Sequence, residues 1–156
     1  MVWDALSAAS VFALGPEGLD DYRVPIAWME SRLSAVPAPR PELRHLFSNA
    51  LGGLLLRAGR LEEAIVRVNE GIAAFKDMQL PNDWIYLALA HARKGNMVEA
   101  RKMLDRLRDW RPDSPPSFWD LEELSLLRSE TEGLLFDAGF LGDPFQGFAE
   151  SGRCPP

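Results

Sequence analysis

The sequence predicts an all-α fold of antiparallel helix-turn-helix units that stack on one another. The first observation is a short pattern of small and apolar residues that occurs twice, with equivalent positions 36 residues apart. Leu51-Gly52, Gly59, Ala64 and Val68 in the first copy match Leu87-Ala88, Gly95, Ala100 and Leu104 in the second. A unit this short cannot bury its own apolar face and must stack on a neighbour. The second observation is that apolar residues recur at helical spacing between breaks of Gly and Pro.

Two helices are expected before the first copy of the pattern. Residues 3–14 are mostly apolar and are followed by a Gly-Pro pair that ends the helix. The second helix carries an apolar stripe up to Val36, and Pro25 lies in its first turn, where the missing N–H costs little. The proline-rich residues 37–41 then form an extended connector, because proline disfavours helix in the residue before it.

The duplicated stretch itself predicts two helical hairpins. The expected helices are 43–58 and 61–78 in the first hairpin, and 83–94 and 98–110 in the second. Gly59 fits a left-handed C-cap between the first two helices. Small residues let the paired helices approach closely, and a larger residue would cost about 1–3 kcal/mol of overpacking at each position. These small residues are Gly52, Ala64, Ala88 and Ala100.

An acidic helix is expected at 117–136, where Ser117 and Asp120 resemble a capping box. From residue 139 onward Gly and Pro are frequent and no period holds, so 139–156 is expected to be a loose tail. The predicted organisation is one helical domain followed by this tail. The domain spans 1–138 and consists of units at about 1–38, 43–78 and 81–114 with the end helix.

Composition restricts the function classes. The chain has 156 residues, 47% hydrophobic and 26% charged, which is typical of one soluble globular domain. Its net charge of −6 makes it a poor candidate for nucleic-acid binding. No apolar run approaches the roughly 18 residues of a membrane span. The acidic N-terminal residues do not resemble a secretory signal, and a single cysteine indicates a reducing compartment, so we expect a cytoplasmic protein.

Residues that could carry chemistry have simpler structural explanations. Glu62 and Glu63 begin a helix, where acids stabilise the macrodipole. His45 and His91 have no Cys or His at metal-ligand spacing, and Cys154 has no neighbouring His that could activate it. We therefore expect no catalytic residues, no metal and no cofactor.

These residues resemble the tetratricopeptide repeat (TPR), in which an aromatic, Leu-Gly or Leu-Ala, Ala and a closing Pro stand at fixed spacing. The third unit matches best, with Trp84, Leu87-Ala88, His91, Ala100, Leu104 and Pro112. The middle unit has Ser48, Leu51-Gly52, Leu55, Ala64 and Val68, with Lys76 where Pro would stand. The first unit is degenerate. The resemblance implies a short right-handed superhelix over 1–114, with 117–136 as its solvating end helix.

A closer likeness is to the C-terminal repeat segments of large bacterial serine/threonine kinases and WD40-repeat proteins. It rests on the runs LGGLLLRAGRLEEAI and YLALAHARKGNMVEARKMLDR, followed by a Trp and an acidic helix. The chain contains no glycine-rich loop with a Val-Ala-Ile-Lys strand, no His-Arg-Asp and no Asp-Phe-Gly, so kinase activity is not carried over.

The TPR resemblance implies a concave groove lined by the first helix of each unit. Carried over by position, the groove residues are Asn49, Gly53, Leu56, Arg57, Ile85, Leu89, Ala92 and Arg93. Some relatives clamp a peptide C-terminus with two Lys and two Asn, but here only Asn49 stands at a suitable position. The mixed face instead suits an apolar helix or peptide with acidic flanks, because Arg57 and Arg93 border its leucines and isoleucine.

The sequence therefore predicts a non-enzymatic protein-interaction module that binds a protein or peptide. One alternative is a structural, self-associating part of a larger assembly, motivated by five tryptophans and by Phe140, Phe145 and Phe148. Another is a small-ligand regulator that uses the same groove. A series of basic residues between 93 and 111 allows three interpretations: a solvated face paired with nearby acids, packing beside the acidic helix, or a site for an acidic partner.

Overall fold

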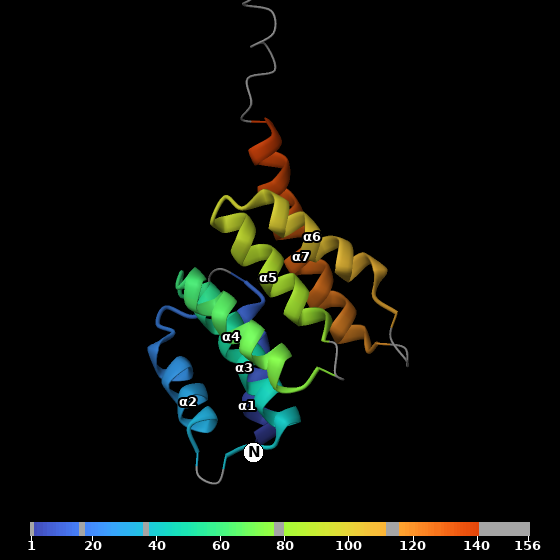
Figure 1. The fold of residues 1–156 in the computed structure, drawn as a ribbon. Helices are drawn as coiled ribbons and strands as arrows, with labels where there is room; N and C mark the ends of the chain where they lie inside the picture. Colours follow the sequence, from blue (N-terminus) through green and yellow to red (C-terminus); the bar gives the residue numbers. More distant parts are fainter. Residues whose placement is uncertain (1, 16–17, 36–37, 77–79, 112–115, 141–156) are drawn as a thin grey trace, which may run out of the picture.

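The computed structural model describes residues 2–15, 18–35, 38–76, 80–111 and 116–140. In these ranges the chain forms seven α-helices and no strand, and helices that neighbour one another pack antiparallel (Figure 1). The all-α prediction is confirmed. The helices are α1 (Val2–Ala13), α2 (Arg23–Leu33), α3 (Pro41–Arg57), α4 (Leu61–Ala74), α5 (Pro81–Arg93), α6 (Met97–Asp109) and α7 (Phe118–Phe140).

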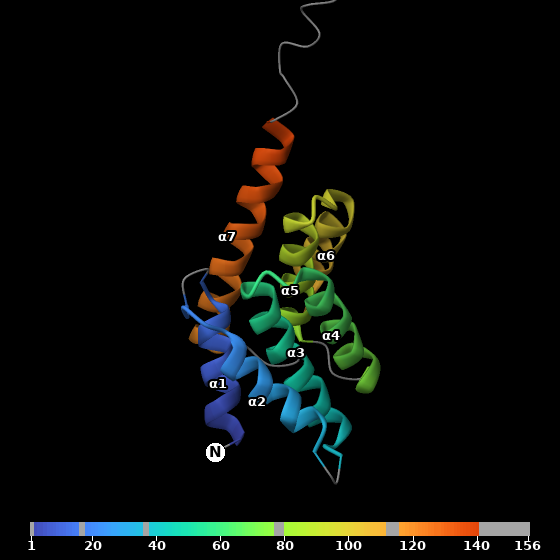
Figure 2. The same cartoon turned by 90° about the vertical axis from the view of Figure 1, so that its left-hand side faces the viewer.

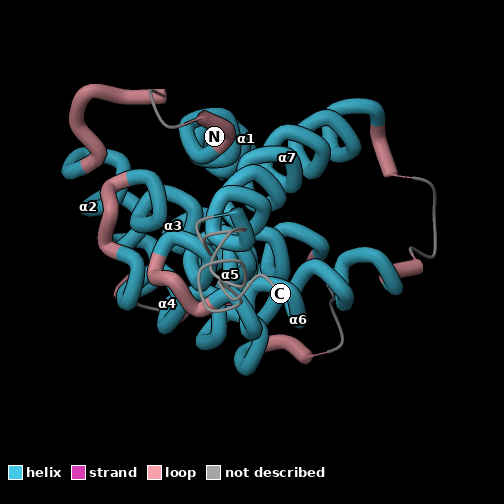
Figure 3. Tube along the Cα trace, turned by 90° about the horizontal axis from the view of Figure 1, so that it is seen from above, coloured by secondary structure: helices cyan, strands magenta, loops and turns pink. Residues whose placement is uncertain are grey.

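The helices form three layers, with α3 and α5 in the middle. On one side α1 packs against α3 and α7 packs against α5. On the other side α4 packs against α3 and α6 against α5, while α2 lies on α3 (Figures 2 and 3). The two central helices therefore have neighbours on opposite faces.

The sequences of α3 and α5 explain their central position. Every residue from 47 to 57 in α3 and from 85 to 90 in α5 is buried. Both segments are mostly apolar or small on all sides, with Asn49 and Arg57 of α3 as exceptions, and a helix of that kind is stable only when it is covered all round. By contrast, α4 and α6 keep one charged, exposed face.

Two adjacent glycines in α3 allow the close packing of this middle layer. A Cβ on Gly52 would overlap the Val68 side chain and lie 3.5 Å from the Ala64 carbonyl oxygen. This confirms that Gly52 brings the two helices of the hairpin close together. A Cβ on Gly53 would lie 2.9 Å from both the Ala13 Cβ and the Tyr86 ring, so this glycine is the point where α1, α3 and α5 meet.

Each hairpin turn is closed by a glycine in the left-handed region. Gly59 has φ +75° and Gly95 has φ +80°. The Arg60 N–H donates to the Leu55 carbonyl at 2.9 Å, and the Asn96 N–H makes the equivalent bond at 2.8 Å, as in a Schellman motif. The C-cap predicted at Gly59 is confirmed.

The ends of two helices differ from the prediction. The helix α4 ends at Ala74 rather than at 78, because Phe75 adopts an extended conformation with φ −146° and ψ 84°. The helix α7 continues to Phe140 rather than stopping at 136, since one glycine, Gly139, does not end a helix by itself.

The capping box predicted at the start of α7 is confirmed. The Asp120 N–H donates to Ser117 Oγ at 3.2 Å, and the Ser117 N–H donates to Asp120 Oδ2 at 2.9 Å. The expected closing Pro112 and most of the predicted tail, with Phe145, Phe148 and Cys154, lie outside the described residues.

Candidate functional site

The predicted groove residues lie on α3 and α5, where Gly53 and Arg57 adjoin the end of α1, and Arg57 and Arg93 bond to α7. Seven of the eight are buried. They are Asn49, Gly53, Leu56, Arg57, Ile85, Leu89 and Ala92. The eighth, Arg93, keeps 24% of its side chain exposed. We call this surface the α3–α5 face. In this structure it is an internal contact surface occupied by the chain's own helices, which the sequence did not foresee.

Arg57 joins three helices through hydrogen bonds of its guanidinium group. Its Nε donates to the Ala13 carbonyl at 2.7 Å and its Nη2 to the Leu14 carbonyl at 2.9 Å, which satisfies the C-terminal end of α1. Its Nη1 donates to Glu130 Oε1 of α7 at 2.9 Å. The Arg57 side chain is fully buried, so these bonds take the place of water that its charge would otherwise bind.

Arg93 approaches the same carboxylate from α5. Its Nη2 donates to Glu130 Oε1 at 2.6 Å, and its Nη1 donates to the Leu56 carbonyl at 3.2 Å. We call Arg57 and Arg93 the arginine clamp. It holds one carboxylate between two cations, and charge-assisted bonds of this kind are about twice as strong as neutral ones.

A second polar cluster lies near the other end of the α3–α5 contact. His45 Nε2 lies 2.7 Å from Asp83 Oδ2, and Asn49 Nδ2 donates to Asp83 Oδ1 at 2.7 Å. An ionised carboxylate only accepts, so Nε2 carries the imidazole proton while Asp83 is charged. His–Asp pairs orient bases in enzymes, but the side chains of this pair are 0% and 3% exposed. A substrate has no access to them, and the cluster ties α3 to α5.

Sequence reasoning missed this second cluster because its members are distant in the chain. The repeat pattern places Asn49 in the groove, and the sequence shows no partner for His45 at ligand spacing. A usable signal was present: His45 and Asn49 stand four residues apart and therefore share one face of a helix. That face also carries apolar residues and is therefore expected to be buried. The two polar side chains on it then need a buried hydrogen-bond acceptor.

Glu123 of α7 is a half-buried carboxylate with neutral partners. It accepts hydrogen bonds from Asn82 Nδ2 at 2.7 Å and from the Tyr86 hydroxyl at 3.1 Å. Burial raises the pKa of Glu123 and the negative charge of Asp120 adds to this, while the bond from Tyr86 partly opposes it. No cation is among these partners, in contrast to Glu130.

Replacing Glu123 with glutamine is therefore expected to raise the midpoint of thermal unfolding at neutral pH by a small amount. Because the pKa is higher in the folded than in the unfolded state, ionised Glu123 costs folding free energy at neutral pH. That cost disappears below the ordinary pKa of 4.5, where the group is protonated in both states. Calorimetry should show a gain at neutral pH that vanishes below pH 4.5. The control Glu122→Gln, at an exposed position, should show no such pH dependence.

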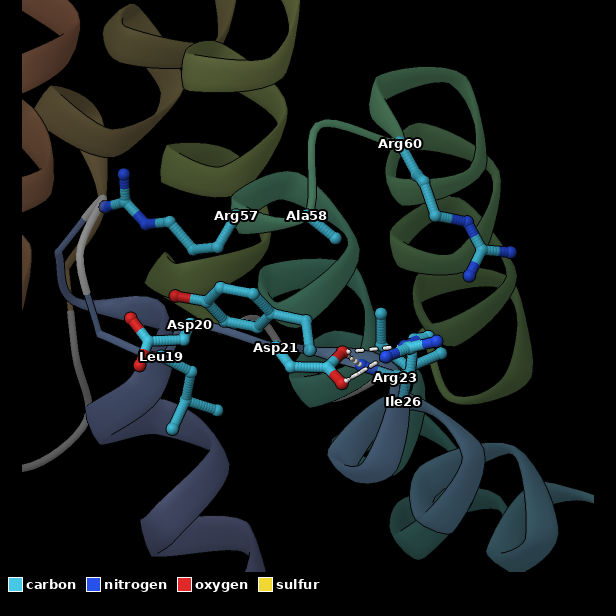
Figure 4. A pocket seen from close by; sticks show the side chains of 9 residues that line it. Leu19, Asp20, Asp21, Arg23, Ile26, Arg57, Ala58 and Arg60 are labelled. Carbon is cyan, nitrogen blue, oxygen red and sulfur yellow. Dashed lines mark hydrogen bonds and ion pairs between the residues drawn. The ribbon is translucent and has the colours of Figure 1, made fainter.

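A cavity of about 620 Å³ lies where the start of α2 meets the end of α3 (Figure 4). Two of its arginines pair with neighbouring acids. Arg23 Nη2 donates to Asp21 Oδ2 at 2.9 Å, and Arg60 Nε donates to Glu63 Oε1 at 2.7 Å. Arg57 also borders it, but its guanidinium is engaged as described above. Asp20 also lines the cavity, so its walls carry charges of both signs.

A second cavity of about 480 Å³ lies between α1 and α2. It exists because these helices pack on α3 rather than on each other. The side chains of Phe12, Trp28 and Met29 line it, and its walls are almost wholly apolar. Such a surface provides few polar groups that could orient a substrate.

The basic series between 93 and 111 fits two of its three interpretations. Arg93 bonds to the acidic helix through Glu130. On α6, Lys102 pairs with Glu99 at 2.7 Å, and Arg108 pairs with Asp105 at 2.9 Å. These exposed pairs contribute little stability and keep the outer face solvated.

Compared with models of known protein families, with curated proteins and with solved structures, the chain gives no match. Among the described residues, no group of three or more His, Cys, Asp or Glu side chains could hold a metal ion. No helix in the described ranges has both the length and the apolar character that crossing a membrane requires.

Proposed function

We propose that this chain is a non-enzymatic protein-interaction module whose α3–α5 face binds an amphipathic helix that carries a carboxylate. The observation that supports the proposal is the pair of arginines that hold Glu130 of α7 on this face. The natural partner is then a protein or peptide with leucines on one side of a helix and an acidic residue beside them.

TPR architecture is part of the proposal. Its support is the equivalence of the two hairpins α3–α4 and α5–α6. Both turns are closed by a left-handed glycine, at Gly59 and Gly95, and both hairpins carry small residues at the helix crossing, including Gly52 and Ala88. Under this proposal α1 and α2 form the degenerate first unit, and α7 is the end helix. Cytoplasmic location remains a prediction from sequence.

Binding is favoured over catalysis by the state of the charged residues around this face. The His45–Asp83 pair is enclosed, and at the cavity beside the start of α2 both Arg23 and Arg60 are engaged by acids. An active site needs a reachable group whose charge or hydrogen bonds are available to a substrate. The arginine clamp, by contrast, is built to hold a carboxylate without changing it.

The test compares partner capture by the full chain with that by Arg93→Gln. Arg93 is the suitable position because it is partly exposed, whereas Arg57 and Asn49 are buried and their replacement would disturb the fold. The matched control is Arg106→Gln, an exposed arginine on α6. We expect a protein that is captured from the source cell by wild type and control, and about tenfold less by Arg93→Gln. Equal capture by all three chains would exclude the arginine clamp as the recognition site.

A further inference from the structure

The helix α7 lies on the α3–α5 face as an amphipathic ligand helix would. Its buried residues follow helical spacing, and they are Leu124, Leu127, Thr131 and Leu135. Leu127 and Thr131 are completely buried, and the Thr131 hydroxyl donates to the Leu127 carbonyl at 2.8 Å within α7 itself. The buried stripe of α7 therefore needs no hydrogen-bond partner from α5, and its contact with the α3–α5 face is apolar.

Glu130 supplies the charge that the face requires. Both arginines of the clamp are held in place by backbone carbonyls that do not belong to α7: Ala13 and Leu14 for Arg57, and Leu56 for Arg93. Without α7 the two guanidinium groups would remain on the face and lack their carboxylate. Cations in such a position need a negative partner, so the face stays specific for an acid when α7 is absent.

The helix α7 is attached mainly to one other helix. It packs on α5 with only a small contact to α6, and its contact with α5 is about as extensive as that of α1 with α3. Between α1 and α7 there is a cavity of about 370 Å³, lined by Ser7 and Ser10 from one helix and Asp120 from the other. The last turns of α7 extend beyond the bundle (Figures 1 and 2). Glu123 adds a half-buried carboxylate whose two hydrogen-bond partners, Asn82 and Tyr86, are neutral and do not balance its charge.

We infer that α7 is an intramolecular occupant of the α3–α5 face, and that a partner displaces it with a helix of the same pattern. That pattern is Leu-x-x-Leu-x-x-Glu, as in Leu124, Leu127 and Glu130. The inference rests on the proposed function, because it takes the α3–α5 face as the binding surface. It adds the chemistry of the ligand helix and the competition that controls access. A partner without an ionised residue opposite Tyr86 and Asn82 would avoid the unfavourable Glu123 contact and so compete well.

The test measures binding of a fluorescein-labelled peptide of residues 117–138 to the full-length chain by fluorescence anisotropy. Leu127→Ala weakens α7 in the chain without altering the α3–α5 face. The matched control is Leu126→Ala, because that side chain is 55% exposed on the same helix. We expect Leu127→Ala to bind the peptide about tenfold tighter than wild type, and Leu126→Ala to bind it as wild type does. A peptide with Glu130→Gln should bind Leu127→Ala about tenfold more weakly than the unmodified peptide.

The outcomes separate the two proposals. If wild type and Leu127→Ala bind the peptide equally well, the face binds helices but α7 does not control access, and only this inference is overturned. If neither binds while circular dichroism shows both folded, the proposed function is overturned as well. Equal binding of the Glu130→Gln peptide would remove the arginine clamp from recognition.

A second measurement uses only the wild-type chain, so it does not depend on a variant that folds. Amide hydrogen exchange should show the slowest amides of α7 exchanging about tenfold faster than those of α3, because α7 leaves the face while the rest stays folded. If the amides of α7 exchange as slowly as those of α3, the helix opens only when the whole protein unfolds, and the inference is wrong.

Discussion

Replacing Asp83 with alanine is expected to lower the free energy of unfolding by about 3 kcal/mol, because it leaves two buried donors without an acceptor. The His45 and Asn49 side chains both bond to this carboxylate at 2.7 Å. Neither can reach water, since both are buried in the α3–α5 contact. Urea denaturation followed by circular dichroism measures the loss.

The matched control for Asp83 is Asp105→Ala. Asp105 is also a helical aspartate with one basic partner, Arg108, but its side chain is 58% exposed. Its replacement should change the free energy of unfolding by no more than about 0.5 kcal/mol. The role assigned to Asp83 is wrong if the two variants lose the same stability. In the double variant Asn49→Ala/Asp83→Ala, the total loss should be smaller than the sum of the single losses, since the two residues share one bond.

Replacing Arg57 with alanine is expected to cost about 3 kcal/mol as well, for a different reason. The change removes the donors from the Ala13 and Leu14 carbonyls at the end of α1 and takes one cation from Glu130. Both covering helices should then become less firmly attached. Chemical denaturation measures the free energy of unfolding. Amide hydrogen exchange should increase more in α1 and α7 than in α4.

Arg60→Ala provides the control for Arg57, three residues away. Arg60 pairs with Glu63 at the surface, where its side chain is 42% exposed. Loss of an exposed pair should change stability by at most about 1 kcal/mol. If Arg57→Ala and Arg60→Ala have equal effects, Arg57 does not join the helices as the hydrogen bonds indicate.

The features of the fold that the sequence predicted correctly are those that depend on local residue patterns. The turn at Gly59, the crossing at Gly52 and the cap at Ser117 each depend on residues close together in the chain. Their physical requirements, a positive φ, room for a neighbouring helix and a bond to a free N–H, are readable from a few positions. The helix ends were less predictable, because whether a residue such as Phe75 continues a helix depends on what packs around it.

The partners of the candidate site could not be predicted in the same way. Arg57 and Glu130 stand 73 residues apart, and His45 and Asp83 stand 38 apart. Periodicity identifies the buried face of a helix, but it does not tell which other element covers it. From the sequence, packing beside the acidic helix was one of three interpretations of the basic residues that include Arg93, but no pattern identified Glu130 as the residue that Arg57 and Arg93 bind.

The arginine clamp also restricts how far a helix can slide along the α3–α5 face. A shift of α7 by one turn would bring a residue four positions away from Glu130 to the clamp, and those residues are Leu126 and Leu134. Either would place an apolar side chain against two guanidinium groups and leave Glu130 elsewhere. A single buried polar contact fixes register in coiled coils for the same reason. Glu130 thus fixes the register of the helix on the α3–α5 face. It favours one alignment over those shifted by one turn, which an apolar stripe alone would not do.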